Sequence, residues 1–172
     1  MPDRQTLPAI WLMSDRALDD ALWQAIDWVP SCGGVVLRHH RSDRAFARRV
    51  AAACSERGLM LAVAGDVGLA REIKAQMVHN PQGDADGLLV SRSVHNAREA
   101  EAAAGADLIF VSPVFATQSH PGAKALGMEQ ALLLARMSGV PAIALGGIDK
   151  KRGNDAIDAG FHGWAAIRAW SE

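Results

Sequence analysis

The chain has 172 residues, of which 49% are hydrophobic and 22% are charged, so it holds enough apolar material for one ordinary domain over residues 1–172. Lys and Arg nearly match Asp and Glu in number and leave a formal net charge of -1, which excludes any strong case for a nucleic-acid-binding or membrane-surface protein. No apolar run approaches the roughly 20 residues that a membrane helix needs, and Cys32 and Cys54 have neither metal-site nor redox spacing. We therefore expect a cytoplasmic protein that acts on a small molecule.

Short apolar runs alternate with segments of helical period along the chain. The apolar runs predict eight strands, at residues 9–13, 34–38, 60–64, 77–79, 88–90, 108–112, 142–145 and 163–167. Apolar residues at helical spacing predict helices at residues 18–28, 44–56, 67–74, 97–104, 129–137 and 151–159. The strands are continuously apolar rather than alternating, which is typical of a parallel sheet that helices cover on its outer side.

Eight such units predict an α/β protein with a closed (β/α)8 TIM barrel. The chain is shorter than the ~200 residues at the lower end of that fold. We therefore expect a short barrel with reduced helices and a vestigial last helix. An open, doubly wound sheet is the alternative that the same alternation of strands and helices allows.

The ends of the sixth and seventh strands carry the most informative residues. Thr117, Ser119 and His120 follow the sixth strand, and Gly146 and Gly147 follow the seventh. Hydroxyl groups, an imidazole and glycine backbone that can approach a ligand closely all suit an anionic small molecule. No G-x-G-x-x-G follows the first strand and no G-x-x-x-x-G-K-[ST] occurs, so dinucleotide and ordinary nucleoside triphosphate chemistry have no support.

Several short segments carry a resemblance to a known family. They are residues 10–16, 35–38, 78–84, 105–107, 113–117, 126–129, 140–141, 146–148 and 159–163. Together they resemble the superfamily of thiamine-phosphate synthase and the thiazole tautomerase TenI, of which this chain looks like a divergent member. The resemblance implies a phosphate-binding barrel that joins hydroxymethylpyrimidine diphosphate to thiazole phosphate and releases pyrophosphate. Such a reaction, expected to pass through a pyrimidine cation, needs Mg²⁺ and cationic donors on the leaving pyrophosphate.

The resemblance also implies roles for individual residues. Arg38 matches the diphosphate-binding arginine, and alternation from Val36 points it into the barrel, although a surface ion pair is the alternative. Asp84 matches one Mg²⁺ ligand, or else caps a turn, and Asp66 could supply a second through a one-residue shift. His79 could face the pyrimidine, or it is a hydrogen-bonded core histidine.

The remaining matches concern phosphate binding. We expect Arg38 and His120 to be catalytic, and His40, Ser91, Thr117 and Ser119 to contact the diphosphate; loop-ordering hydroxyl groups are the alternative for the last three. Gly146, Gly147 and the backbone near Ile167 and Arg168 match the cradle for the thiazole phosphate. The phosphorylated substrates are thus expected to bind at the carboxyl ends of the strands.

Several positions depart from the pattern of a synthase. Val36 replaces a glutamine, His40 and His120 replace lysines, Ala64-Gly65 replaces an Asn-Asp pair, and Arg152 lies near an expected asparagine. Histidine is mostly uncharged at neutral pH, so binding of the diphosphate should weaken. One alternative is therefore an impaired paralogue that binds a phosphorylated thiazole or thiamine phosphate without turnover.

Three further alternatives concern a different reaction, a metal site and an oligomeric state. A tautomerase could use His120 or His40 for proton transfer, although Pro113 stands where the family's histidine is expected. A transition-metal site could form from His40, His79, His120 and Asp84, without supporting spacing. Trp23, Trp28 and Trp170 could form an exposed patch for a homodimer, or they could be buried.

Overall fold

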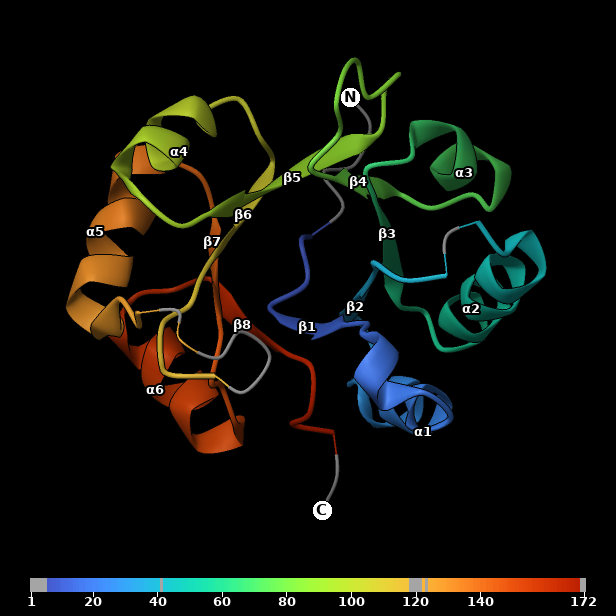
Figure 1. Cartoon of the computed structure of the whole chain (residues 1–172), viewed down its shortest axis with the longest axis horizontal. Coiled ribbons are helices and arrows are strands. Elements are labelled where there is room, and N and C mark those ends of the chain that lie inside the picture. The colour runs from blue at the N-terminus through green and yellow to red at the C-terminus, as the bar shows by residue number, and fades with distance from the viewer. Residues whose placement is uncertain (1–5, 41, 118–121, 123, 171–172) are drawn as a thin grey trace.

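The computed structural model describes residues 6–40, 42–117, 122 and 124–170, and its eight strands form a closed parallel barrel. The strands are β1 (Ile10–Met13), β2 (Gly34–Leu37), β3 (Met60–Ala64), β4 (Met77–His79), β5 (Leu89–Val94), β6 (Leu108–Val111), β7 (Ala142–Leu145) and β8 (Gly163–Ala166). They follow one another around the ring in chain order (Figure 1). Because β8 pairs with β1, with Leu12 opposite Ala166, the predicted barrel is confirmed and the open sheet is wrong.

Helices surround this ring on its outer side. They are α1 (Ala21–Trp28), α2 (Arg44–Glu56), α3 (Val67–Glu72), α4 (Ala97–Ala102), α5 (Gly127–Ser138) and α6 (Lys150–Ala159), with a short 3-10 turn, η1 (Arg16–Leu18), before α1. Helices α1 to α3 lie on one side of the barrel and α4 to α6 on the other (Figure 1). A loop without a helix joins β4 to β5, and in the described chain as far as Trp170 no helix follows β8. The prediction of short helices is confirmed. The last helix, predicted to be vestigial, is absent from the described residues after β8.

Strand β5 is longer than the sequence suggested. The apolar run predicts a strand at residues 88–90, whereas the paired strand continues to Val94, with Ser93 opposite Phe110 of β6. Ser91 and Ser93 interrupt the apolar run but not the sheet, because their hydroxyl groups have hydrogen-bond partners inside the barrel. The polar end of β5 is therefore part of the fold that positions the site.

Side chains alternate between the barrel interior and the layer beneath the helices, as the period of a strand requires. In β2, Val35 and Leu37 pack under the helices, whereas Val36 packs inside. The interior cluster consists of Trp11, Met13, Val36, Met60, Ala62, Met77, Leu108, Phe110, Ile143 and Ala165. A Cβ at Gly34 would lie 2.3 Å from the Trp11 ring, so glycine makes room there for the indole.

Aromatic rings lead from this apolar interior to the polar end of the barrel. Trp11 meets Phe110 edge to face with ring centroids 5.6 Å apart, and Phe110 meets His79 in the same way at 5.3 Å. Such contacts fix ring orientations as well as burying area. The imidazole of His79 therefore lies on a rigid apolar floor.

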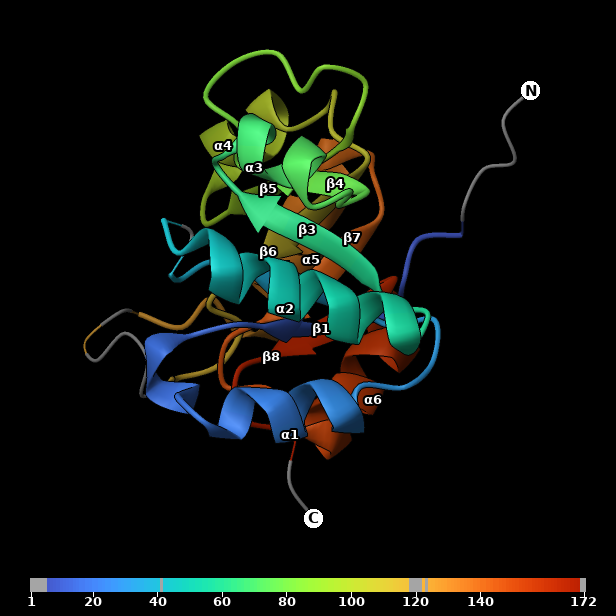
Figure 2. The same ribbon diagram turned by 90° about the vertical axis from the view of Figure 1, so that its right-hand side faces the viewer.

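The outer tryptophans differ in exposure. Figure 2 shows α1 and α2 next to each other over the outside of the barrel, where Trp23 contacts Phe46 at a centroid distance of 5.7 Å. Trp28 is 41% exposed, but Trp170 is only 5% exposed and stacks on Trp164, so for Trp170 the buried alternative is correct.

Within the described ranges, no helix has both the length and the apolar character to cross a bilayer.

Candidate active site

Polar side chains collect where the strands end, one step beyond the apolar interior cluster. Arg38 comes directly after β2, two residues beyond the interior Val36. His79 follows Met77 in β4, and Ser91 and Ser93 continue the interior face of β5. In a parallel barrel these carboxyl ends meet at one face of the molecule. The chain thus places a cation, an imidazole and hydroxyl groups around a common mouth.

The guanidinium of Arg38 is held by groups at the end of β1. Its Nε donates to the carbonyl of Ser14 at 2.9 Å, and its terminal nitrogen donates to Asp15 Oδ2 at 3.3 Å. The backbone N–H of Arg38 donates to Ser14 Oγ at 2.8 Å. Burial lowers the pKa of Arg38 and the charge of Asp15 partly offsets this, but an arginine stays protonated. The sequence allowed either a surface ion pair or a side chain directed into the barrel. Arg38 combines the two, because it pairs with Asp15 and is partly buried at the barrel mouth.

The two histidines after Arg38 lie in different surroundings. His39 is buried, its Nδ1 lies 2.9 Å from Ser14 Oγ, and burial, followed by the charges of nearby groups, lowers its pKa. His40 is exposed, adopts a φ of 51°, and packs its ring against His39 at 4.9 Å and Phe46 at 5.3 Å. His40 therefore lies beside the start of α2, where its ring packs against the rings of His39 and Phe46.

Sequence reasoning missed Ser14, Asp15 and His39 as parts of this site. Ser14 is fully buried and connects β1 to the β2 end through both Arg38 and His39. A signal was present, because Ser14-Asp15 directly follows a buried strand, where polar residues face the barrel mouth.

His79 occupies the centre of a buried hydrogen-bond network. Its Nδ1 lies 3.0 Å from Ser91 Oγ, and its Nε2 lies 3.2 Å from Asn80 Nδ2 and 3.1 Å from Ser93 Oγ. Burial, assisted by the charges of Arg38 and Arg92, lowers the pKa of His79 to about 4. The imidazole is therefore neutral at physiological pH, and protein groups contact both of its nitrogens. Ser93 was also missed, although the alternating Ser91-Arg92-Ser93 pattern pointed to it, and so was Asn80, for which that pattern gave no sign.

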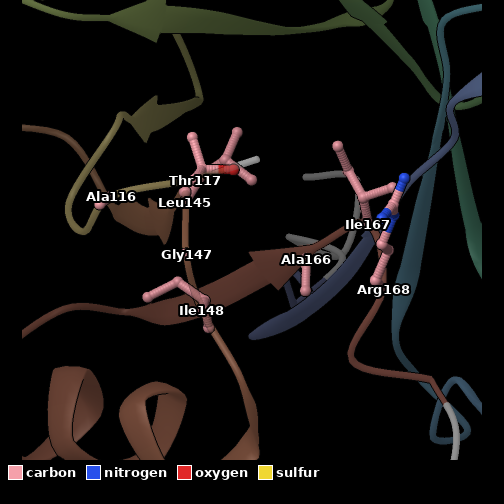
Figure 3. A pocket seen from close by; sticks show the side chains of 9 residues that line it. Ala116, Thr117, Leu145, Gly147, Ile148, Ala166, Ile167 and Arg168 are labelled. Atoms are coloured by element: carbon pink, nitrogen blue, oxygen red, sulfur yellow. The ribbon is translucent and has the colours of Figure 1, made fainter. Parts of the chain in front are cut away.

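A pocket of about 210 Å³ lies between the ends of β7 and β8. Its lining residues are Ala116, Thr117, Leu145, Gly146, Gly147, Ile148, Ala166, Ile167 and Arg168. Figure 3 shows Thr117 on one side of the pocket, Ile167 and Arg168 on the other, and Ala166 between them. The structure thus brings together five of the residues for which the sequence predicted phosphate binding, namely Thr117, Gly146, Gly147, Ile167 and Arg168.

Backbone conformation makes glycine necessary at the base of this pocket. Gly147 has a φ of +63°, and a Cβ there would lie 2.4 Å from the carbonyl oxygen of Ala116. Within the described part of the chain, the N–H groups of Gly147 and Ile148 donate to no backbone carbonyl. Arg152 donates to the Gly147 carbonyl at 2.7 Å and lies over the Phe115 ring at 4.8 Å, so it supports the turn from outside. Gly147 and Ile148 therefore line the pocket with N–H groups that no described backbone carbonyl uses.

The two predicted metal ligands have structural contacts of their own. Asp66 Oδ1 caps α3 by accepting the Leu69 N–H at 2.8 Å, and Asp84 Oδ1 accepts the Asp86 N–H at 2.6 Å in the exposed β4–β5 loop. Arg71 ties that loop to α3 through an ion pair with Asp86 at 2.6 Å. Carboxylates are the ligands that Mg²⁺ takes in ones or twos, together with water and substrate phosphates, so the donor set fits that ion in kind.

A preassembled transition-metal site is not part of the described structure. In residues 6–40, 42–117, 122 and 124–170, no group of three or more His, Cys, Asp or Glu side chains is placed to hold a metal ion. His40, His79 and Asp84 are therefore not a cluster. Ser119 and His120, predicted as a diphosphate contact and a catalytic residue, lie outside the described residues.

Comparison with known proteins bears on the family of this chain and on its barrel fold. Residues 33–170 match the model of a family described as thiamine monophosphate synthase. The chain belongs to the thiamine monophosphate synthase family. It is 33% identical over 179 residues to thiamine-phosphate synthase of Geobacillus kaustophilus, covering 91% of this chain and 79% of that protein. It is 34% identical to the Geobacillus thermodenitrificans thiamine-phosphate synthase over the same shares of each chain.

Solved structures support the same fold. Thiamine phosphate pyrophosphorylase from Pyrococcus furiosus superposes with a TM-score of 0.78 at 20% identity, covering 96% of this chain and 87% of that one. At that identity the superposition bears on the barrel alone. The resemblance seen in the sequence is confirmed at the level of the family, and the individual site residues stay predictions.

Proposed function

We propose that this chain is a thiamine-phosphate synthase, which joins hydroxymethylpyrimidine diphosphate to thiazole phosphate and releases pyrophosphate. One observation carries the proposal: a glycine-lined pocket at β7 and β8 shares a barrel mouth with Arg38, a cation already oriented by Ser14 and Asp15. Two separate anion sites at one mouth suit a reaction between two phosphorylated substrates. The named relatives support the same reaction.

The pocket between β7 and β8 would hold the thiazole phosphate. The backbone N–H groups of Gly147 and Ile148 supply donors that do not depend on side-chain identity, and Thr117 and Arg168 border the same space. Backbone donors in a glycine turn suit a monophosphate because they surround its oxygens at close range. This pocket would hold one of the two substrates at the ends of β7 and β8.

Arg38 and Ser91 would hold the diphosphate across the mouth. As the bond to the pyrimidine methylene breaks, negative charge grows on the leaving pyrophosphate, and fixed donors stabilise that charge without reorganising. Mg²⁺, which Asp84 and Asp66 would hold with the phosphate oxygens, supplies further charge stabilisation when bound. Ser119 and His120 belong to the proposal as additional contacts on the same group.

Val36 favours a second candidate function. Its side chain is fully buried in the apolar interior cluster, so it offers nothing to the pyrimidine amino group. A base that bound there with an unpaired polar group would lose on the order of 1 to 3 kcal/mol. This observation favours a relative that keeps the thiazole phosphate pocket and binds thiamine phosphate without making it.

Incubation of the purified chain with both substrates and Mg²⁺ tests the first proposal. We expect thiamine phosphate and pyrophosphate in equal amounts, with formation abolished by a chelator. No product above the rate without enzyme would overturn the synthase. In that case, calorimetric binding of thiamine phosphate would support the second candidate, and absence of binding would overturn both.

The remaining expectations about this enzyme have tests of their own. We propose that it works in the cytoplasm and forms a homodimer through the exposed face around Trp28, where Lys150 lies 5.4 Å from the indole centroid. Sedimentation of the wild type and of Trp28→Ala tests the dimer, which the variant should weaken.

A further inference from the structure

The chain that follows β8 turns back toward the end of that strand. β8 ends at Ala166, and the Nε1–H of Trp170 donates to the Ala166 carbonyl at 3.0 Å in a buried hydrogen bond. Ala166 is itself part of the barrel, where it pairs with Leu12 of β1. The hydrogen bond therefore closes residues 166–170 into a loop whose two ends are tied together at the sheet.

A second contact fixes the indole of Trp170. Its ring stacks on that of Trp164 in β8, with the centroids 5.5 Å apart and an angle of 18° between the ring planes. Trp164 is held from another side by α6, because the backbone of Gly153 packs so closely that a Cβ there would lie 2.6 Å from the ring. Both indoles are buried. Trp170 is thus anchored by a hydrogen bond and by stacking, which involve different parts of the ring.

The residues inside this loop form one wall of the phosphate pocket. Ile167 and Arg168 line the pocket on the side opposite Thr117 (Figure 3). The N–H of Ile167, like those of Gly147 and Ile148, donates to no backbone carbonyl of the described residues. The position of this wall, and of the N–H group that it brings to the pocket, depends on the path of residues 167–169.

No helix of the described chain holds this wall. In a (β/α)8 barrel a helix normally follows each strand and fixes the loop between them, but none follows β8 as far as Trp170. Ordering a loop when a ligand binds costs conformational entropy, and a loop that is already ordered avoids this cost. The indole of Trp170 supplies here the fixation that a helix supplies after most of the other strands.

We propose that Trp170 is a positioning residue that holds Ile167 and Arg168 in place as one wall of the phosphate pocket. Trp170 is not among the residues that line the pocket, so it acts through the loop that it closes. The ligand would be the thiazole phosphate of the proposed function, on which this part of the inference rests. Loss of the indole leaves every lining residue in the chain and frees the backbone that carries two of them.

Backbone and indole NMR tests the positioning without any ligand. In the wild type we expect the Trp170 indole N–H to be protected from hydrogen exchange, and the heteronuclear NOE values of Ile167 and Arg168 to match those of β8. Trp170→Phe keeps a ring for stacking and removes the donor, whereas Trp170→Ala removes both, so the NOE values should fall in that order. An unprotected indole in the wild type, or unchanged NOE values in Trp170→Ala, would overturn the proposal.

Calorimetry with two ligands tests the consequence for binding. We expect the Kd for thiazole phosphate to rise about threefold in Trp170→Phe and about tenfold or more in Trp170→Ala, since ordering one backbone residue corresponds to about tenfold in Kd. The Kd for pyrophosphate with Mg²⁺, which the proposed function assigns to Arg38, should stay within about twofold of the wild type in both variants. Should Trp170→Ala fail to fold, Trp170→Phe carries the same comparison.

Two results of this experiment would overturn the proposal. An unchanged Kd for thiazole phosphate would show that the wall needs no anchor. Equal losses for thiazole phosphate and pyrophosphate would show general damage to the barrel. Failure of the proposed function has a different signature, in which the NOE values and both Kd values change as expected but the wild type forms no thiamine phosphate.

Trp23→Phe is the matched control. Trp23 is a partly buried indole on α1 that contacts the Phe46 ring at 5.7 Å and the Arg49 guanidinium at 4.5 Å, and it does not line the pocket. The same substitution at this position should change neither the NOE values of Ile167 and Arg168 nor the Kd for thiazole phosphate. Equal effects of Trp23→Phe and Trp170→Phe would contradict a specific role of Trp170.

Discussion

The guanidinium of Arg38 lies 3.3 Å from the carboxylate of Asp15, across the neighbouring ends of β2 and β1. Two contacts of different kinds hold it, because its Nε also donates to the Ser14 carbonyl at 2.9 Å. Both contacts require the planar, forked donors of arginine. The cation is therefore oriented before any ligand arrives, and little side-chain freedom is left to lose on binding.

Arg38→Lys keeps the charge but removes this fixed geometry. We expect the Kd for pyrophosphate to rise about tenfold to a hundredfold, since a hydrogen bond to a charged group contributes about 1.5 to 3 kcal/mol. Calorimetry in the presence of Mg²⁺ measures it. Arg48→Lys, an exposed change in the ion pair with Glu72, should leave the Kd unaltered. A wild-type Kd for Arg38→Lys would show that Arg38 does not contact the anion.

Gly147→Ala should damage both the fold and the phosphate pocket. A left-handed φ costs an ordinary residue about 1 to 2 kcal/mol, and the new Cβ would also collide with the Ala116 carbonyl oxygen at 2.4 Å. We expect a loss of about 2 to 4 kcal/mol in the free energy of unfolding, with thiazole phosphate binding abolished. Urea denaturation and calorimetry measure the two effects.

Gly58→Ala separates the two causes. Gly58 has a similar φ of +65°, but a Cβ there meets no atom within 4 Å. We expect this variant to lose only the conformational term and to bind thiazole phosphate normally. Equal destabilisation of the two variants would mean that the chain relaxes around position 147.

The sequence predicted the strands better than it predicted the site, for a physical reason. Buried apolar runs predicted the strands to within one residue at each end except at β5, because the other strands are largely apolar, whereas β5 continues through Ser91, Arg92 and Ser93. The Gly146-Gly147 turn was found for a similar reason, since local conformation dictates those residues. Ser14, Asn80 and Ser93 were missed because their roles depend on pairing between strands, which brings residues 13 to 24 positions apart into contact. Only the alternating hydroxyl groups of β5 gave a local sign of this network.

His79 should make stability depend on pH in a defined window. Its pKa is about 4 in the folded chain, below the 6.5 of an ordinary histidine. Between these values the unfolded chain binds a proton that the folded chain does not, so stability falls as pH falls from 6.5 toward 4 and is complete above 6.5. The loss from this group is on the order of 3 kcal/mol by the lower end of the window.

Urea denaturation of the wild type and of His79→Gln at neutral and acid pH measures this effect. The wild type should lose about 2 to 3 kcal/mol more than the variant on acidification. His39, whose pKa burial also lowers, acts in the same direction in both proteins and cancels in the difference. An identical acid loss in wild type and His79→Gln would contradict a neutral, buried His79.

We expect Asp66 both to cap α3 and to bind Mg²⁺. An asparagine at this position can separate these two roles, because it keeps the capping oxygen and removes the charge. Its Oδ1 caps α3 at 2.8 Å from the Leu69 nitrogen, and an asparagine keeps that acceptor. Asp66→Asn should therefore stay within about 0.5 kcal/mol of wild-type stability, while the Mg²⁺ concentration that half-saturates pyrophosphate binding rises severalfold. Asp84→Asn should shift the same titration.

Asp43→Asn is the control for this last experiment, because Asp43 caps α2 in the same manner at 2.9 Å from the Phe46 nitrogen. That variant should match the wild type in both stability and Mg²⁺ titration. If Asp66→Asn and Asp43→Asn titrate alike, Asp66 is a helix cap alone, and the metal is held by Asp84 and the phosphate oxygens. A shift at Asp66 without loss of stability would instead assign its charge to the Mg²⁺ site at the barrel mouth.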